Sequence, residues 1–238
     1  MIKKSFLLAT LCAGCLSTKA QPAVYASIDT TRTKVEGKKN LEFLEVRNQS
    51  DEIAESGYLL QGKKDGVWKK YYTNGPLNRL EEYSDGVLNG TVVELNRGGT
   101  IDLDENYVDG KLHGLRVKYH YGMQSVIEHY KSGLLHGEKI MYYENSQKQE
   151  EGVYNNGKRE GETKWYNQDG KLITMYTYKD GRLEGPIKEY YANGTVQKEG
   201  NHINDVEEGE WKEYSEDGKL KKTVLYKNGT VVKEILAK

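Results

Sequence analysis

The stretch YKDGRLEGPIKEYYANG, residues 178–194, contains the unit from which nearly the whole chain is built. Its three glycines, Gly181, Gly185 and Gly194, recur about every 24 residues, and one repeat is a residue short between Gly114 and Gly122. A regular period of this length is typical of a repeat array rather than of a compact enzyme. The first column of structural repeat glycines comprises Gly66, Gly90, Gly114, Gly137, Gly161, Gly185 and Gly209.

Asn-Gly and Asp-Gly pairs mark most positions of the other two glycine columns, as in Asp180-Gly181 and Asn193-Gly194. These pairs supply the positive φ angles that tight hairpin turns need. The stretches between them run for about five to eight residues and are rich in Tyr, Val, Ile, Thr and Lys, which is typical of strands. We therefore predict an all-β fold, in which tandem antiparallel β-hairpins form an elongated single-layer meander sheet of fourteen strands.

Two columns of tyrosine run in register with the glycines, and we expect both to be structural. A tyrosine ring can cover a thin sheet while its hydroxyl group stays in water. Trp68 and Trp211 share a further column near the two ends of the array, where we expect them to act as end caps. The tyrosine columns comprise Tyr71, Tyr119, Tyr142, Tyr166, Tyr190 and Tyr214, and Tyr83, Tyr107, Tyr130, Tyr154, Tyr178 and Tyr226.

The N-terminal segment is interpreted as a secretory signal peptide, because Lys3 and Lys4 precede an apolar run. Cleavage after Ala20 would place the protein in the periplasm or the medium. The alternative is lipoprotein processing at Cys15, which would tie the chain to a membrane. The predicted organisation is a signal peptide at 1–20, a flexible lead-in at 21–41, a degenerate capping repeat at 42–65, and seven repeats with a C-terminal strand at 66–238.

Several classes of function are excluded by what the mature chain would lack. Both cysteines, Cys12 and Cys15, lie in the leader, so no disulfide, thiol nucleophile or Cys-based metal site is expected. A chain starting at Gln21 has 32 basic and 36 acidic residues, which gives no basic excess for nucleic acid. No motif of a nucleophile, a zinc site or a phosphate loop is recognisable. We therefore predict a protein that is not an enzyme and has no cofactor and no metal.

Three charged columns are expected to be solvated. His113 and His136 occupy equivalent places, and a zinc ion shared between them would need further ligands. Their column continues as Glu160, Glu184 and Glu208, which indicates an exposed turn position. A second acidic column comprises Glu81, Glu105 and Glu128, and a basic column comprises Lys69, Lys164, Lys188 and Lys212.

Binding candidates come from places where two tyrosines are adjacent. Neighbouring strand residues point to opposite faces, so the second tyrosine points away from its packed neighbour. Tyrosine is enriched among the residues that dominate interfaces, and a row of exposed rings would suit a peptide or a glycan. The binding candidates are Tyr72, Tyr143 and Tyr191.

The pattern Tyr178-x-x-Gly181-x-x-x-Gly185-x-x-x-x-Tyr190-x-x-x-Gly194 resembles a MORN repeat, in the variant form of the YwqK-like antitoxin family. The resemblance covers residues 42–232 and implies a hairpin array that binds a protein partner, a toxin in that family. Because a single glycine, as at Gly161, replaces the Gly-x-Gly of eukaryotic MORN units, their lipid binding is not carried over. We expect an exported protein-binding scaffold, with envelope polysaccharide or lipid-surface binding and a structural spacer as alternatives.

Overall fold

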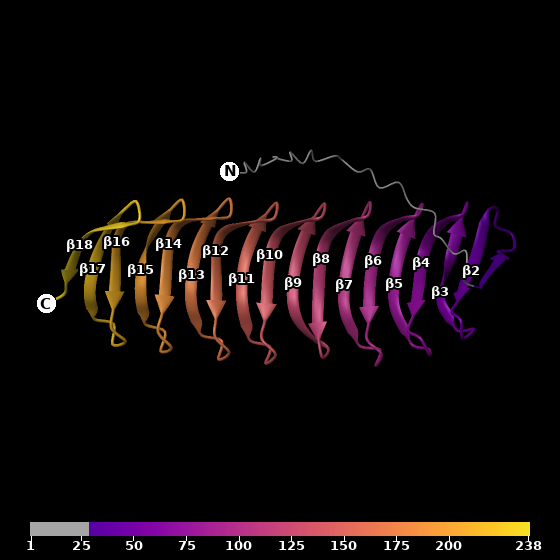
Figure 1. Ribbon diagram of the computed structural model, residues 1–238, viewed down its shortest axis with the longest axis horizontal. Coiled ribbons are helices and arrows are strands. Elements are labelled where there is room, and N and C mark those ends of the chain that lie inside the picture. Colours follow the sequence, from indigo (N-terminus) through magenta and orange to yellow (C-terminus); the bar gives the residue numbers. More distant parts are fainter. Residues whose placement is uncertain (1–28) are drawn as a thin grey trace, which may run out of the picture.

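The computed structural model describes residues 29–238 (Figure 1). Every element of regular secondary structure in that range is a β-strand. The predicted signal peptide, with Cys15 and Ala20, lies outside the described residues. None of the elements in residues 29–238 is an apolar helix of membrane-spanning length. The strands are β1 (Thr30–Lys34), β2 (Leu41–Arg47), β3 (Ile53–Leu60), β4 (Lys63–Tyr71), β5 (Leu77–Ser84), β6 (Val87–Leu95), β7 (Ile101–Val108), β8 (Lys111–His120), β9 (Met123–Lys131), β10 (Leu134–Tyr142), β11 (Lys148–Asn155), β12 (Lys158–Tyr166), β13 (Leu172–Lys179), β14 (Arg182–Tyr190), β15 (Val196–Ile203), β16 (Val206–Tyr214), β17 (Leu220–Lys227) and β18 (Thr230–Leu236).

Each strand pairs antiparallel with the next strand in the chain, from β1 to β18, so the sheet is one open meander. Figure 1 shows the strands side by side along the long axis of the molecule. The predicted all-β hairpin array is therefore confirmed, with 18 strands instead of fourteen. The four further strands are β1, β2 and β3 at the N-terminal end and the C-terminal strand β18, which was expected in addition to the seven two-strand repeats. Residues 30–34, which we expected to belong to a flexible lead-in, form β1 and pair with β2.

Two kinds of connection alternate along the sheet, and each forms one of its long edges. At the tight-turn edge, two residues with positive φ join the strands, as Asp85 (φ 51°) and Gly86 (φ 83°) do between β5 and β6. At the long-loop edge the loop is wider, and in the loop between β4 and β5 Tyr72 N donates to Pro76 O at 3.0 Å. The shortened repeat replaces this wider loop by a tight turn, with Tyr121 (φ 50°) at its tip.

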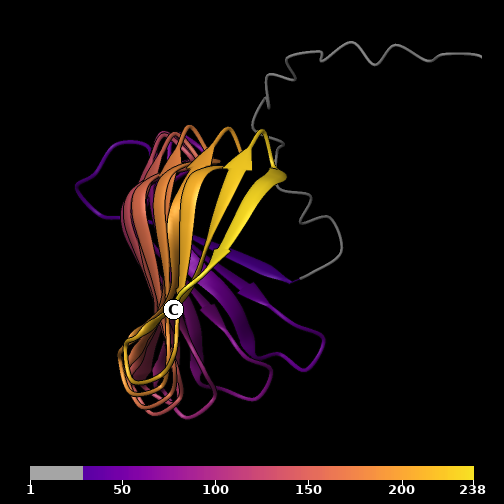
Figure 2. The same cartoon turned by 90° about the vertical axis from the view of Figure 1, so that its left-hand side faces the viewer.

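The first glycine column marks a bulge within the hairpins. Between β5 and β6, Glu81 is opposite Val92 and Tyr83 is opposite Leu88, so a single residue of β5 faces three residues around Gly90. Gly90 has a φ of 132°, which favours glycine at this position. Bulges bend strands and increase their twist. Figure 2, viewed along the long axis, shows the bent strands and the gradual rotation of the sheet.

The cross-strand register separates the side chains into two faces. We call one the packed face, because it holds most of the buried side chains. Near its two ends, Trp68 packs with Leu44, Val46 and Leu59, and Trp211 with Ile187 and Val224. The opposite face, called the open face, carries one row of direct neighbours across the sheet. That row is Leu80, Val93, Asp104, Val117, Ile127, Ile140, Glu151, Lys164, Met175, Lys188, Glu199, Lys212 and Thr223.

Candidate functional site

The three predicted binding tyrosines lie at the long-loop edge and are half-buried. Each donates its hydroxyl proton to a backbone carbonyl of the next repeat: Tyr72 to Leu95 at 2.9 Å, Tyr143 to Tyr166 and Tyr191 to Tyr214, both at 2.8 Å. The loop that follows each carbonyl begins with Asn96, Asn167 or Ser215, whose side chains bond within their own loops. The structure thus gives these tyrosines a contact that joins consecutive repeats.

Replacing Tyr143 with phenylalanine is expected to lower the free energy of unfolding by about 0.5–1.5 kcal/mol, the typical net contribution of one hydrogen bond. Urea denaturation followed by circular dichroism measures the change. The control is Tyr121→Phe, because Tyr121 is 84% exposed and its loss should be neutral. A Tyr143→Phe protein as stable as its parent would show that this hydroxyl group is not needed between repeats.

The acidic column of Glu81, Glu105 and Glu128 was expected to be solvated, and that expectation is wrong. The three residues are only 4%, 4% and 8% exposed, on the packed face. Each carboxylate accepts a hydrogen bond from the tyrosine two residues later, at 2.9, 2.5 and 3.1 Å respectively. Register explains the burial, since each residue stands opposite a side chain of the neighbouring strand where the hairpin is bulged.

Basic side chains compensate the buried carboxylates. Glu81 Oε1 accepts from Lys70 Nζ at 3.0 Å and from Arg79 Nε at 2.7 Å. Arg116 lies between the other two carboxylates, with Nε 3.0 Å from Glu105 and one terminal nitrogen 3.1 Å from Glu128. A buried charge is tolerated when it is paired and hydrogen-bonded in this way. We therefore interpret the column as structural.

Burial and these partners shift the pKa values in a direction that predicts how stability depends on pH. Burial opposes ionisation of Glu81, but bonds from Lys70 and Tyr83 outweigh it and lower its pKa from 4.5. Burial raises the pKa of Tyr107 to about 12, and its hydrogen bond to Glu105 adds to the effect.

Stability should therefore fall at both pH extremes. A lowered carboxyl pKa stabilises the fold above 4.5, and this contribution is lost as the pH falls through the lower folded value. A raised tyrosine pKa means that the unfolded chain loses its proton first, so stability decreases as the pH rises from 10 towards 12. Thermal melting measured from acid to alkaline pH tests both losses of stability, and Tyr107→Phe should weaken the loss at alkaline pH. A loss at alkaline pH that is unchanged in Tyr107→Phe would contradict the assignment.

Trp68 and Trp211, which we expected to act as end caps, are buried on the packed face. They are 0% and 1% exposed. Each ring lies over a glycine of the neighbouring strand, Gly57 and Gly200 respectively. A Cβ atom added at Gly57 would be 2.4 Å from Trp68 Cδ2, and one at Gly200 would be 2.1 Å from Trp211 Cδ2. The glycines therefore provide the space that each indole ring fills.

The column of histidines and glutamates lies within strands, not in turns as expected. Glu160, Glu184 and Glu208 each accept a backbone N–H from the tight turn of the next repeat, at 3.0, 2.8 and 2.7 Å. They therefore hold consecutive turns together. Among residues 29–238, no three His, Cys, Asp or Glu side chains are grouped so that they could hold a metal ion, and His113 and His136 belong to no such group.

The C-terminal half of the open face combines half-exposed tyrosines with paired charges. Tyr166 donates to Glu151 at 2.5 Å, and Tyr214 to Glu199 at 2.8 Å, so this tyrosine column lies beside the open-face row. In that row Glu151 is opposite Lys164, and Glu199 stands between Lys188 and Lys212. The predicted basic column is thus not simply solvated here but interleaved with carboxylates.

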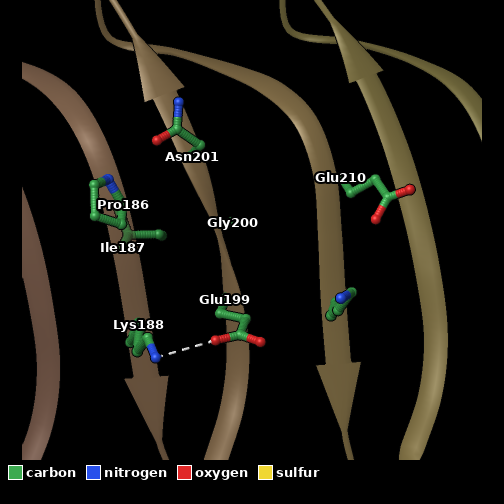
Figure 3. A pocket seen from close by; sticks show the side chains of 8 residues that line it. Pro186, Ile187, Lys188, Glu199, Gly200, Asn201 and Glu210 are labelled. Carbon is green, nitrogen blue, oxygen red and sulfur yellow. Dashed lines mark ion pairs between the residues drawn. The ribbon is translucent and has the colours of Figure 1, made fainter.

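A hollow of about 330 Å³ lies on this part of the open face (Figure 3). Lys188 Nζ and Glu199 Oε2 form its ion pair, 3.3 Å apart, with side chains 39% and 30% exposed. The hydrogen bond from Tyr214 and the nearby Lys188 lower the pKa of Glu199. Gly200, which has no side chain, forms part of the floor. The remaining lining residues are Pro186, Ile187, Asn201, Glu210 and Lys212.

The lining of the hollow is chemically mixed. The hollow is shallow and lined by both signs of charge, an amide and an apolar ring. The Glu199 carboxylate accepts a hydrogen bond from Tyr214 and forms an ion pair with Lys188. Lys188 and Lys212 were recognisable in the sequence as members of one column, whereas Glu199 becomes their neighbour only through strand register.

The fold and these contacts define a single-sheet array of hairpin repeats. Five segments match the model of the MORN repeat variant, at residues 64–85, 135–156, 159–180, 183–204 and 207–228. The chain is therefore a MORN repeat variant protein. A search of curated proteins finds no match. The shortened repeat, with Tyr121 in its tight turn, lies between the first and second matched segments.

Proposed function

We propose that the chain is an exported, non-enzymatic scaffold that binds a protein partner on the C-terminal half of its open face. The observation that carries this proposal is the combination of half-exposed tyrosines, paired charges and the hollow at Gly200 on one continuous surface. Tyrosine contributes large contact area at interfaces, and repeat arrays offer extended surfaces to their partners.

The charge pattern favours a protein partner over a polyanion. Lys188 and Lys212 lie on either side of Glu199, so positive charge is interrupted at each step across the strands. A nucleic acid would favour an uninterrupted basic stripe. A protein surface carries both signs of charge, and it can pair with Lys and Glu in alternation.

The resemblance to YwqK-like antitoxins supports a narrower form of the proposal, in which the partner is a toxin. The basic start and apolar run of the N-terminal segment support export, so the partner would be met in the cell envelope or outside the cell. Capture of the partner from an envelope fraction would support export, whereas capture from cytosol alone would contradict it.

The experiment uses the immobilised protein to recover partners from an envelope fraction, followed by identification of the bound proteins. Lys212→Glu should reduce recovery at least about tenfold, because a like charge meets the partner's acidic groups there. The matched control is Lys69→Glu, which changes the same repeat position in the N-terminal half of the array. Equal effects of the two substitutions would refute the placement of the binding surface on the C-terminal half of the array. Recovery of no protein would refute the proposal that the partner is a protein.

A further inference from the structure

Both ends of the sheet present an edge strand whose residues are all exposed. These strands are β1, with five residues, and β18, with seven. Among the described residues, β1 pairs only with β2 and β18 only with β17. Their outer backbone N–H and C=O groups are thus free to pair with another strand, as edge strands generally are. Val232 and Leu236, at 58% and 72% exposure, give the β18 edge an apolar character.

In each edge strand, the backbone hydrogen bonds to the neighbouring strand show which residues direct their backbone N–H and C=O groups away from the sheet. Asp29 O accepts from Arg47 N at 2.9 Å, so the alternate residues Thr30, Arg32 and Lys34 direct their backbone groups outward. At the other end, Ala237 N donates to Lys221 O at 2.8 Å, so Glu234 and Leu236 are the outward residues.

The side chains of these outward residues lie on the same face at both ends. Arg32 is opposite Leu44, and Glu234 is opposite Val224, and both partners belong to the clusters of the packed face. Because strand direction alternates along the meander, β1 of a second copy would run antiparallel to β18. Pairing the two edges would thus continue the antiparallel alternation of strands, bring outward backbone groups opposite each other, and keep the packed face on one side of the joined sheet.

The charges at the two edges are complementary. Lys222 Nζ lies 3.4 Å from Glu213 and 3.6 Å from Glu234, which ends a row of alternating charge on the packed face. At the other edge, Arg32 lies 3.7 Å from Glu42. Arg32 and Glu234 are 58% and 49% exposed, so each has room for a second partner.

We propose that β18 of one copy pairs antiparallel with β1 of a second copy, so that copies join end to end in one continuous sheet. The register places Arg32 opposite Glu234 and Thr30 opposite Leu236. The alternating row then runs from Lys222 through Glu234 and Arg32 to Glu42 without interruption. A head-to-tail contact of this kind leaves a free edge at each end, and it therefore builds an open filament rather than a closed dimer.

Light scattering coupled to size-exclusion chromatography tests the proposal on the full chain over a wide range of concentration. We expect masses that grow through successive multiples of the monomer mass. Glu234→Arg and the double variant Arg32→Glu/Lys34→Glu should each remain monomeric, because like charges then meet at the junction. Mixing the two variants restores opposite charges at both kinds of junction and should restore growth.

Lys233→Glu is the matched control, since it changes the charge of the same strand by two units, in the opposite direction to Glu234→Arg and on the open face, and should leave assembly intact. Circular dichroism verifies that each variant is folded. A wild-type protein that is monomeric throughout would overturn the proposal. Assembly that stops at two copies would contradict end-to-end joining and would indicate a symmetric dimer in which two β18 strands pair. Failure of the mixed variants to assemble would refute the pairing of Arg32 with Glu234.

Discussion

Replacing Gly200 with alanine is expected to lower the free energy of unfolding by about 3–5 kcal/mol, the range found when a large buried aromatic side chain loses its packing. The added Cβ would lie 2.1 Å from Trp211 Cδ2, a distance that real Cβ contacts essentially never show. The ring has to move, and it is now only 1% exposed among Ile187 and Val224. Chemical denaturation followed by tryptophan fluorescence and circular dichroism measures the loss.

A double-mutant cycle separates this clash from a general effect of alanine. Trp211→Ala alone should be destabilising, but adding Gly200→Ala to it should cost little, because the ring that would clash is gone. Gly98→Ala is the control in a loop, where the nearest atom to an added Cβ is the side-chain oxygen of Asn96 at 3.3 Å. Additive losses at Gly200 and Trp211 would contradict the proposed contact.

Replacing Arg116 with methionine is expected to cost about 3–5 kcal/mol, because it leaves two buried carboxylates without their shared cation. Tyr107 and Tyr130 still donate to Glu105 and Glu128, but neither carries a positive charge, and Lys139 Nζ, 4.0 Å from Glu128, is the nearest cation left to the pair. Urea denaturation followed by circular dichroism measures the loss.

Lys188→Met is the matched control, because it removes a cation of similar reach from an exposed pair on the other face. Lys188 and Glu199 are 39% and 30% exposed, and such pairs contribute about 0–1 kcal/mol. If Arg116→Met proved no more destabilising than Lys188→Met, the buried network would not be needed for stability.

The fold was predictable because turn chemistry is local. Asp85-Gly86 and its equivalents require positive φ at consecutive residues, and a sequence shows such pairs directly. A regular interval between them then implies hairpins that follow one another along a sheet. The number of strands was less accessible, since β1 and β3 lack the repeat's glycine pattern.

The faces of the sheet were not predictable from columns alone. Glu81 and Glu160 both belong to acidic columns, yet one is buried beside Arg79 and the other caps a neighbouring turn. Which face a column occupies depends on the bulge, and the bulge changes the register between strands. One local signal was present, because each buried glutamate precedes a tyrosine by two residues, as Glu105 precedes Tyr107.

The contacts between glycine and tryptophan also correspond to a regular spacing in the sequence. Gly57 and Gly200 lie outside the three glycine columns, and each stands 11 residues before a tryptophan. The open-face hollow was predictable only in part. Lys188 and Lys212 were recognisable as one column, but Glu199 becomes their neighbour through pairing of β14, β15 and β16. Likewise, the bonds of Tyr143 to the next repeat depend on how two loops are stacked.

The strictly sequential pairing of the strands has a mechanical consequence. A force that pulls the two chain ends apart reaches only the outermost strand at each moment, and it opens that strand's hydrogen bonds one after another. The array should then lengthen by peeling one hairpin at a time at low force, while the remainder stays intact. Each 24-residue unit would release roughly 80 Å of extended chain.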